Sequence, residues 1–180
     1  MKLNNLLNMA WMQVLWFGAI IGAADDLVWP APVLLIAFAI WQSRAVNAIG
    51  GDFKLMLVAV VIGLILDTTW IQLGWLEYAT PWPAADIAPL WILLLWAGLA
   101  LTLNHSLAWL QSRLWLAALL SGLASPFSYL AATKLGGVQI ITESWLWLIG
   151  LGVSWAIALP ALLWLAGQWN QTGQEVQNYE

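Results

Sequence analysis

The sequence contains no cysteine and only one histidine, His105. Without cysteine the chain can form no disulfide, no thiolate metal site and no cysteine nucleophile. A single histidine excludes bis-histidine haem ligation within one chain and any zinc site that needs two imidazoles. We therefore expect no metal site and no other cofactor.

Charged side chains are scarce as well, at 8% of the 180 residues, whereas ordinary soluble domains contain about 25%. Hydrophobic residues make up 63% of the chain. A soluble chain of this length could not cover its surface with so few charges. In bilayer hydrocarbon, by contrast, inserting each charged side chain costs roughly 2.5–3.5 kcal/mol, so a membrane-spanning chain must have few of them. The composition predicts an integral membrane protein, and the net charge of −4 leaves no basic patch for nucleic acid.

Breaks in the apolar runs predict an all-α, polytopic bundle of six transmembrane helices. These form a single domain, 1–169, which a polar cytoplasmic tail, 170–180, follows. The expected spans are Asn8–Ala24, Trp29–Ser43, Leu55–Leu76, Pro89–Leu110, Leu114–Lys134 and Ser144–Gln168, with a loop at Glu77–Asp86. Most reach the roughly 17–25 residues that cross about 30 Å of hydrocarbon. The second span is short, so the sequence leaves open whether it fully crosses the bilayer.

The basic residues predict the orientation of the six spans. Such spans place Lys2, Arg44, Lys54 and Arg113 on one side of the membrane and only Lys134 on the other. Because loops rich in Lys and Arg stay in the cytoplasm, we expect both termini there.

The sixteen tryptophans are the most unusual feature of the composition. Nine lie at or near the expected span ends, where an indole can bury its ring and leave its N–H in water: Trp29, Trp41, Trp75, Trp82, Trp109, Trp115, Trp145, Trp147 and Trp169. Five lie deeper in the spans: Trp16, Trp70, Trp91, Trp96 and Trp155. Core packing is the default interpretation of the deeper group, and an aromatic pocket for an apolar ligand is the alternative.

Asp67 is an acidic residue within the third span. At 1.5 Å per residue it lies about 18 Å from the inner end of that span. The fifth span brings Pro126 and Tyr129 to a similar depth, which predicts a polar cluster between Asp67 and the proline-broken turn. The cluster is either a functional carboxyl group or a helix–helix hydrogen bond that fixes packing.

A second polar group, Asn104-His105-Ser106, is expected near the cytoplasmic boundary, about 22–24 Å from the outer end of the fourth span. An imidazole there can exchange protons near neutral pH, and Arg113 can hold a phosphate or carboxylate head group. The alternative is an interfacial His–Asn pair bonded to neighbouring helix ends. Because Asp67 and His105 differ in depth by about 10 Å or more, we expect no direct pair between them.

Several stretches together resemble one bacterial family: Leu66-Asp67, Ala88-Pro89-Leu90-Trp91-Ile92, Leu103-Asn104-His105-Ser106-Leu107 and Pro126-Phe127-Ser128-Tyr129. That family is domain-of-unknown-function family 2878, small inner-membrane proteins without an assigned activity. Its members are often encoded near enzymes of cyclopropane-type fatty-acid modification. The resemblance therefore implies a multi-pass protein of the bacterial inner membrane with a place in lipid metabolism. It carries over no catalytic residues.

From these observations we expect an enzyme or accessory factor in fatty-acyl or phospholipid modification. The candidate catalytic residues are His105, Asn104 and Asp67, and the candidate substrate-binding residues are Arg113, Ser106, Tyr129 and Trp91. Its partners would be membrane lipids and a lipid-modifying enzyme. Two alternatives are a non-enzymatic scaffold that holds a soluble partner at the membrane, and a small proton-linked transporter that uses Asp67.

Overall fold

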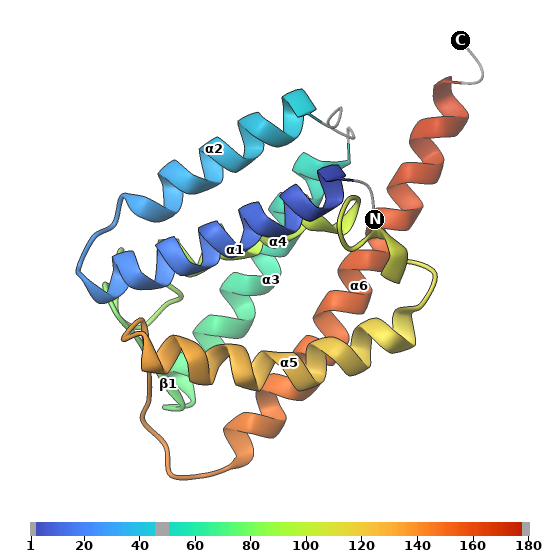
Figure 1. The fold of residues 1–180 in the computed structure, drawn as a ribbon. Coiled ribbons are helices and arrows are strands. Elements are labelled where there is room, and N and C mark those ends of the chain that lie inside the picture. The colour runs from blue at the N-terminus through green and yellow to red at the C-terminus, as the bar shows by residue number, and fades with distance from the viewer. Residues whose placement is uncertain (1–2, 46–50, 178–180) are drawn as a thin grey trace.

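The computed structural model describes residues 3–45 and 51–177, and within them the predicted all-α class is confirmed (Figure 1). The helices are α1 (Leu3–Ala24), α2 (Pro30–Ala45), α3 (Asp52–Gln72), α4 (Leu90–Leu103), α5 (Leu114–Lys134) and α6 (Leu146–Gln177). Between them lie the strands β1 (Leu76–Tyr78) and β2 (Val138–Ile140) and the 3₁₀ turn η1 (Ala108–Leu110). Lys2 and the last three residues of the predicted tail lie outside the described residues.

Among the described residues, four helices are long and apolar enough to cross a membrane: α1, α3, α5 and the Leu146–Trp169 part of α6. The other two are shorter, with 16 residues in α2 and 14 in α4. At 1.5 Å per residue they are about 24 and 21 Å long, less than the roughly 30 Å of bilayer hydrocarbon. The prediction that the fourth span continues to Leu110 is wrong, because α4 ends at Leu103.

The polar residues after Leu103 end α4. The backbone N–H groups of His105 and Leu107 both donate to the carbonyl oxygen of Thr102, at 3.1 and 2.9 Å. These bonds tighten the chain into a turn in place of the regular helical pattern. Asn and Ser favour such turns because their side chains offer hydrogen bonds that compete with the helix. Asn104 and His105 therefore follow the helix and are not part of it.

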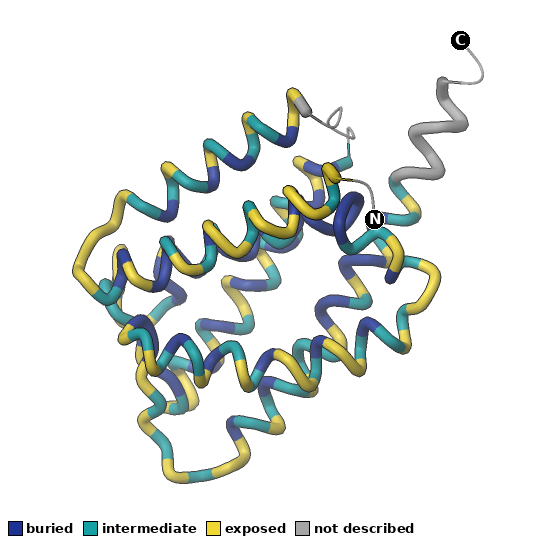
Figure 2. Tube along the Cα trace, viewed as in Figure 1, coloured by how far each residue is buried: buried dark blue, intermediate teal, exposed yellow. Residues whose placement is uncertain are grey.

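Helix α4 is the central element of the bundle. It packs against α1, α2 and α3 and also contacts α6, whereas α5 packs mainly against α6 (Figure 1). Ten of its 14 residues are buried. The outer faces of the surrounding helices are exposed (Figure 2), and they carry large apolar side chains such as Leu57, Leu123 and Phe127. Such faces suit contact with lipid rather than water.

Small residues allow the closest helix contacts. A side chain on Gly122 of α5 would lie 3.1 Å from the carbonyl oxygen of Gly152 in α6, and the reverse distance is 3.0 Å. On α1, a side chain at Gly18 would overlap Leu34 of α2. Close approach of backbones at small residues is a usual source of helix association in lipid, and here it operates within the monomer.

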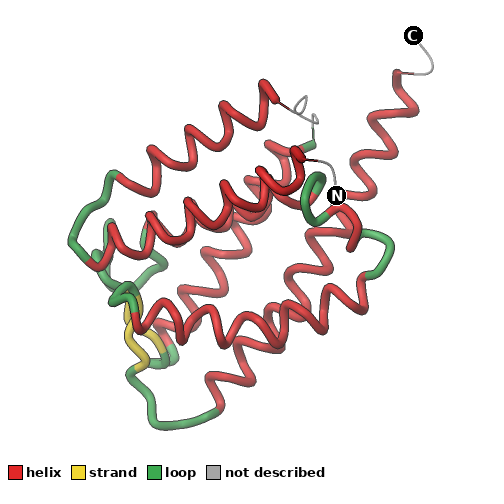
Figure 3. The backbone as a smooth tube through the Cα atoms, viewed as in Figure 1, coloured by secondary structure: helices red, strands yellow, loops and turns green. Residues whose placement is uncertain are grey.

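At one end of the bundle, β1 and β2 form a two-stranded antiparallel sheet (Figure 3). Leu76 pairs with Ile140 and Tyr78 with Val138. Strand β1 includes the first two residues of the loop that was expected at Glu77–Asp86. Because side chains alternate along a strand, Glu77 faces out while Tyr78 is buried beneath the sheet. This alternation aims Tyr78 into the bundle.

Candidate functional site

Helix α3 carries two buried carboxyl groups on one face. Its buried residues recur at spacings of three and four, which is the period of a helix face: Asp52, Leu55, Ala59, Gly63, Asp67 and Trp70. Asp52 is 1% exposed and Asp67 is fully buried. They are 15 positions apart, or about 22 Å along the helix, so each anchors its own polar cluster.

Three hydrogen-bond donors converge on Asp67. The hydroxyl groups of Tyr78 and Tyr129 both donate to Oδ1, at 2.5 and 2.6 Å, and the indole N–H of Trp96 donates to Oδ2 at 2.7 Å. The donors come from β1, α5 and α4. Both carboxyl oxygens are therefore engaged, and one side chain joins four elements.

Two local features hold these donors in place. Gly63 lies one helical turn before Asp67, and a side chain there would overlap the Trp96 indole, which also stacks on Trp155 at 4.5 Å. At the sheet, burial raises the pKa of Tyr78 well above its usual value, and the Asp67 carboxyl group raises it further. The Tyr78 hydroxyl therefore keeps its proton and remains a donor.

A cavity of about 110 Å³, the tryptophan cavity, adjoins this cluster. Its walls include the side chains of Trp16, Trp91, Trp96, Trp155, Ser128 and Tyr129, with aliphatic residues between them. Four of the five tryptophans expected at depth therefore surround one space. Trp96 and Tyr129 both line the cavity and both donate to Asp67, so these two side chains link a buried carboxyl group to an apolar space.

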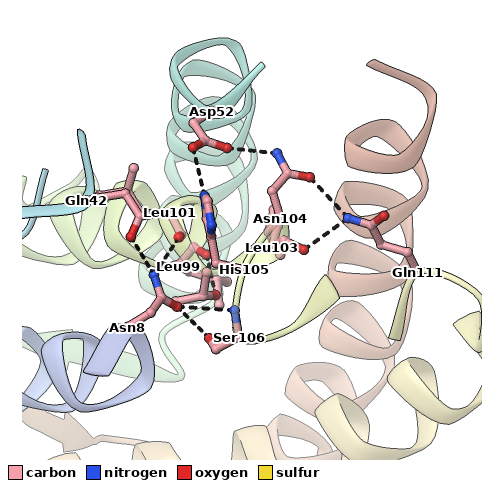
Figure 4. Close-up of polar contacts among 11 residues, drawn as sticks. Asn8, Gln42, Asp52, Leu99, Leu101, Leu103, Asn104, His105, Ser106 and Gln111 are labelled. Carbon is pink, nitrogen blue, oxygen red and sulfur yellow. Dashed lines mark hydrogen bonds and ion pairs between the residues drawn. The ribbon is translucent and has the colours of Figure 1, made fainter. Parts of the chain in front are cut away.

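The second carboxyl group, Asp52, holds His105 and Asn104 (Figure 4). Nε2 of His105 lies 3.0 Å from Oδ2 of Asp52, and the side-chain amide of Asn104 donates to Oδ1 at 2.7 Å. Gln111 donates to Asn104 and to the carbonyl oxygen of Leu103. The Asp52 carboxyl group therefore joins the start of α3 to the turn that follows α4.

Asn8 of α1 forms the centre of an adjacent network. Its amide donates to Oε1 of Gln42 at 2.9 Å and to the carbonyl oxygen of Leu101 at 3.0 Å, and its own oxygen accepts from the Ser106 hydroxyl at 2.6 Å (Figure 4). Nε2 of Gln42 is the one buried side-chain nitrogen or oxygen without a hydrogen-bond partner in the described part of the chain. The network joins α1, α2 and the end of α4.

The structure brings the sequence-predicted residues together in two groups and leaves one apart. Tyr129 meets Asp67, and Trp91 lines the same cavity while its indole donates to the carbonyl oxygen of Ala79. His105 and Asn104 meet on Asp52, with Ser106 on the neighbouring Asn8. Arg113 precedes α5 and is exposed. As expected, Asp67 and His105 have separate partners.

Six residues of these clusters are absent from the set of site residues predicted from the sequence: Asp52, Tyr78, Trp96, Asn8, Gln42 and Gln111. The sequence could have identified Asp52, because it lies 15 positions before Asp67 and therefore on the same face of the helix. No feature of the sequence indicates Tyr78, because its position depends on the pairing of β1 with β2. Among the described residues, no three His, Cys, Asp or Glu side chains come together to hold a metal ion.

Comparison with known proteins gives one match. A family model described as "Protein of unknown function (DUF2878)" matches residues 5–161, which confirms the resemblance identified from the sequence. No curated protein and no solved structure matches the chain.

Proposed function

The chain belongs to the DUF2878 family, whose description assigns no activity, and we propose that it binds a membrane lipid and acts in fatty-acyl or phospholipid modification, as an enzyme or an accessory factor. In this proposal it is a multi-pass protein of the bacterial inner membrane. Its ligands are membrane lipids, and a lipid-modifying enzyme is its partner where it serves as an accessory.

One observation carries this proposal. Tyr129 and Trp96 line the tryptophan cavity and at the same time donate hydrogen bonds to Asp67. An apolar cavity with a few convergent polar groups is the usual form of a small-molecule site. An ionisable side chain within a membrane span is costly to bury, so its placement beside such a cavity favours a function.

The proposal includes six membrane crossings with both termini in the cytoplasm. Support comes from the helix ends that polar contacts join. Asn8 near the start of α1 contacts Gln42 near the end of α2, and Asp52 at the start of α3 contacts His105 after α4. The α1–α2 turn, β1 and β2 gather at the opposite end (Figure 1).

The charges agree with this orientation. Arg44 lies in the last turn of α2, Lys54 in the first turn of α3, and Arg113 just before α5. All three therefore belong to the end that contains Asn8 and Asp52. By the positive-inside rule this end faces the cytoplasm. The short α2 and α4 would be accommodated by local thinning of the bilayer.

In this orientation the His105 cluster lies at the cytoplasmic surface, at the depth of lipid head groups. We assign to His105 the exchange of protons with the polar end of a lipid or partner, and to Asn104 and Ser106 the hydrogen bonds that bind that end. Arg113, which is exposed nearby in sequence, would hold a phosphate or carboxylate. Support for a role of His105 comes from its pairing with Asp52, since a carboxylate partner fixes the orientation of an imidazole.

The membrane lipid profile of cells tests the proposal. Cells that lack the gene would be compared with cells that carry wild type, Asp67→Asn, His105→Ala or the exposed control Asp86→Asn, each at matched membrane levels. We expect a specific acyl or phospholipid species to disappear in the deletion and in Asp67→Asn, and to return with wild type and Asp86→Asn. An unchanged profile in the deletion strain would show that the lipid assignment is wrong.

A further inference from the structure

A groove between α1 and α5 adjoins the tryptophan cavity. The groove has a volume of about 360 Å³ and is lined by Met12, Gln13 and Trp16 of α1 and Ala124, Phe127 and Ser128 of α5. Met12, Trp16 and Ser128 also line the tryptophan cavity. The two spaces are therefore neighbours that share these three side chains.

The position of the groove determines what can reach it. Both flanking helices are among the four long enough to cross a membrane. Gln13 lies about 15 Å along α1 and Ser128 about 21 Å along α5, so the groove opens well inside the span. Phe127 beside it is 72% exposed. In a bilayer the groove therefore meets hydrocarbon chains, and a lipid head group is held at the membrane surface.

The size of the tryptophan cavity limits what it can hold. Its volume of about 110 Å³ is smaller than the roughly 150 Å³ cavity that accommodates benzene. A short segment of a single chain fits this volume, and a whole lipid or a phosphorylated head group does not. The rest of the chain would lie in the larger groove.

The polar groups at the junction complete the site. Ser128 lines both spaces, and the hydroxyl group of the neighbouring Tyr129 donates to Asp67. A chain segment in the cavity would therefore touch the Tyr129 and Trp96 side chains that hold the carboxyl group. No head-group charge is needed to place it there.

We propose that the groove between α1 and α5 is a lateral entrance, through which a lipid presents its hydrocarbon chain, and not its head group, to Tyr129 and Asp67. This inference rests on the proposed function and narrows it to the acyl chain as the part of the lipid that the site receives. The His105 cluster, about 22 Å from Asp67 along α3, lies outside this site.

Photo-crosslinking in vesicles tests the entrance. The full chain would be reconstituted in phosphatidylethanolamine–phosphatidylglycerol vesicles with one of two phospholipid probes. One probe carries a diazirine near the methyl end of an acyl chain, and the other carries it beside the ester group. We expect the chain-end probe to label peptides that contain the buried residues Trp96 and Tyr129, and the ester-side probe to label them about tenfold less.

Two matched variants test the route. Ser128→Trp fills the junction and should reduce chain-end labelling of the Tyr129 peptide by about tenfold. Leu123→Trp adds the same ring to the exposed outer face of α5 and should leave labelling unchanged. If Ser128→Trp does not accumulate, the two-probe comparison in wild type decides alone. Equal labelling by both probes, or adducts confined to exposed residues outside the groove such as Leu57, would overturn the inference.

The labelling result and the lipid profile separate the two proposals. Chain-end labelling that Ser128→Trp blocks, with an unchanged profile in the deletion strain, would keep the entrance and reject the role in lipid modification. A changed profile with labelling of Tyr129 by the ester-side probe would keep that role and reject presentation by the chain.

Discussion

The imidazole of His105 and the carboxyl group of Asp52 face each other across the start of α3 and the end of α4, with 3.0 Å between Nε2 and Oδ2. They are 53 positions apart in sequence, and both are buried. Asn104 adds a bond from the same turn to the other carboxyl oxygen. The pair therefore fastens the end of a short helix to the start of a long one, at the end of the bundle where α1 and α2 also meet.

Removal of the Asp52 carboxyl group should destabilise the fold. In Asp52→Ala, His105 and Asn104 both lose a buried hydrogen-bond partner, and each buried polar group left without its partner costs about 1–3 kcal/mol. We expect the free energy of unfolding in detergent to fall by about 3 kcal/mol. The exposed Asp86→Ala serves as the control and should unfold like wild type. Equal stability of the two variants would show that the Asp52–His105 contact does not hold the helices together.

A methyl group at Gly63 should disturb the Asp67 cluster. In Gly63→Ala the new Cβ would overlap the Trp96 indole, which stacks on Trp155 and donates to Asp67. Overpacking of this kind costs about 1–3 kcal/mol. Gly167→Ala is the matched control, because its Cβ would make only an ordinary contact with Gln111. Thermal unfolding of both variants checks this, and a Gly63→Ala protein as stable as Gly167→Ala would contradict it.

The long spans could be predicted because their signal is local. Apolar runs of about twenty residues specify a crossing by length and composition alone, and α5 was predicted with its observed bounds, Leu114–Lys134. The meeting of Asp67 with Tyr129 also followed from depth, since 1.5 Å per residue fixes how far each lies along its helix.

The features that the sequence did not predict depend on contacts between distant segments of the chain. Apolar residues resume after Ser106, and the turn after Leu103 is held by bonds to the distant Asp52 and Asn8 as well as by local backbone bonds to Thr102. Tyr78 lies in a three-residue strand whose partner is about sixty positions away. Asp52 sits in a polar stretch before the third span, so it reads as a solvent-exposed residue until its helix face is considered.

High pH should destabilise the protein partly through Tyr78. In the unfolded chain a tyrosine loses its proton near pH 10, while burial and Asp67 keep Tyr78 protonated to a higher pH in the fold. Between these values the unfolded state binds fewer protons, so the free energy of unfolding falls as pH rises. At neutral pH the contribution is fully present, and Tyr78→Phe should lose about 1 kcal/mol with the hydrogen bond.

Unfolding measured from about pH 8 to about pH 11 separates these effects. Relative to its own value at the lower pH, Tyr78→Phe should lose less stability than wild type as the pH increases. Parallel pH profiles for the two proteins would show that the buried Tyr78 hydroxyl does not contribute to the alkaline loss.

The membrane topology can be mapped cleanly because the chain has no cysteine of its own. Single cysteines would replace the exposed residues Asp25, Arg44, Asp86, Arg113 and Glu143, which lie in or beside successive turns between the helices. A thiol reagent that does not cross membranes would be applied to intact spheroplasts and to permeabilised ones. Six crossings predict labelling from outside at Asp25, Asp86 and Glu143, and labelling only after permeabilisation at Arg44 and Arg113.

The labelling pattern decides whether the short helices α2 and α4 cross the bilayer. If neither crossed the bilayer, a chain that starts inside would place Arg44 outside and Asp86 inside, while Asp25, Arg113 and Glu143 kept the same sides. If α2 alone crossed, Asp86 would stay outside and Arg113 would move there as well. The labels at Arg44, Asp86 and Arg113 therefore distinguish the possible paths. Only the six-crossing pattern keeps Asp52 and His105 at the cytoplasmic surface together with the basic residues.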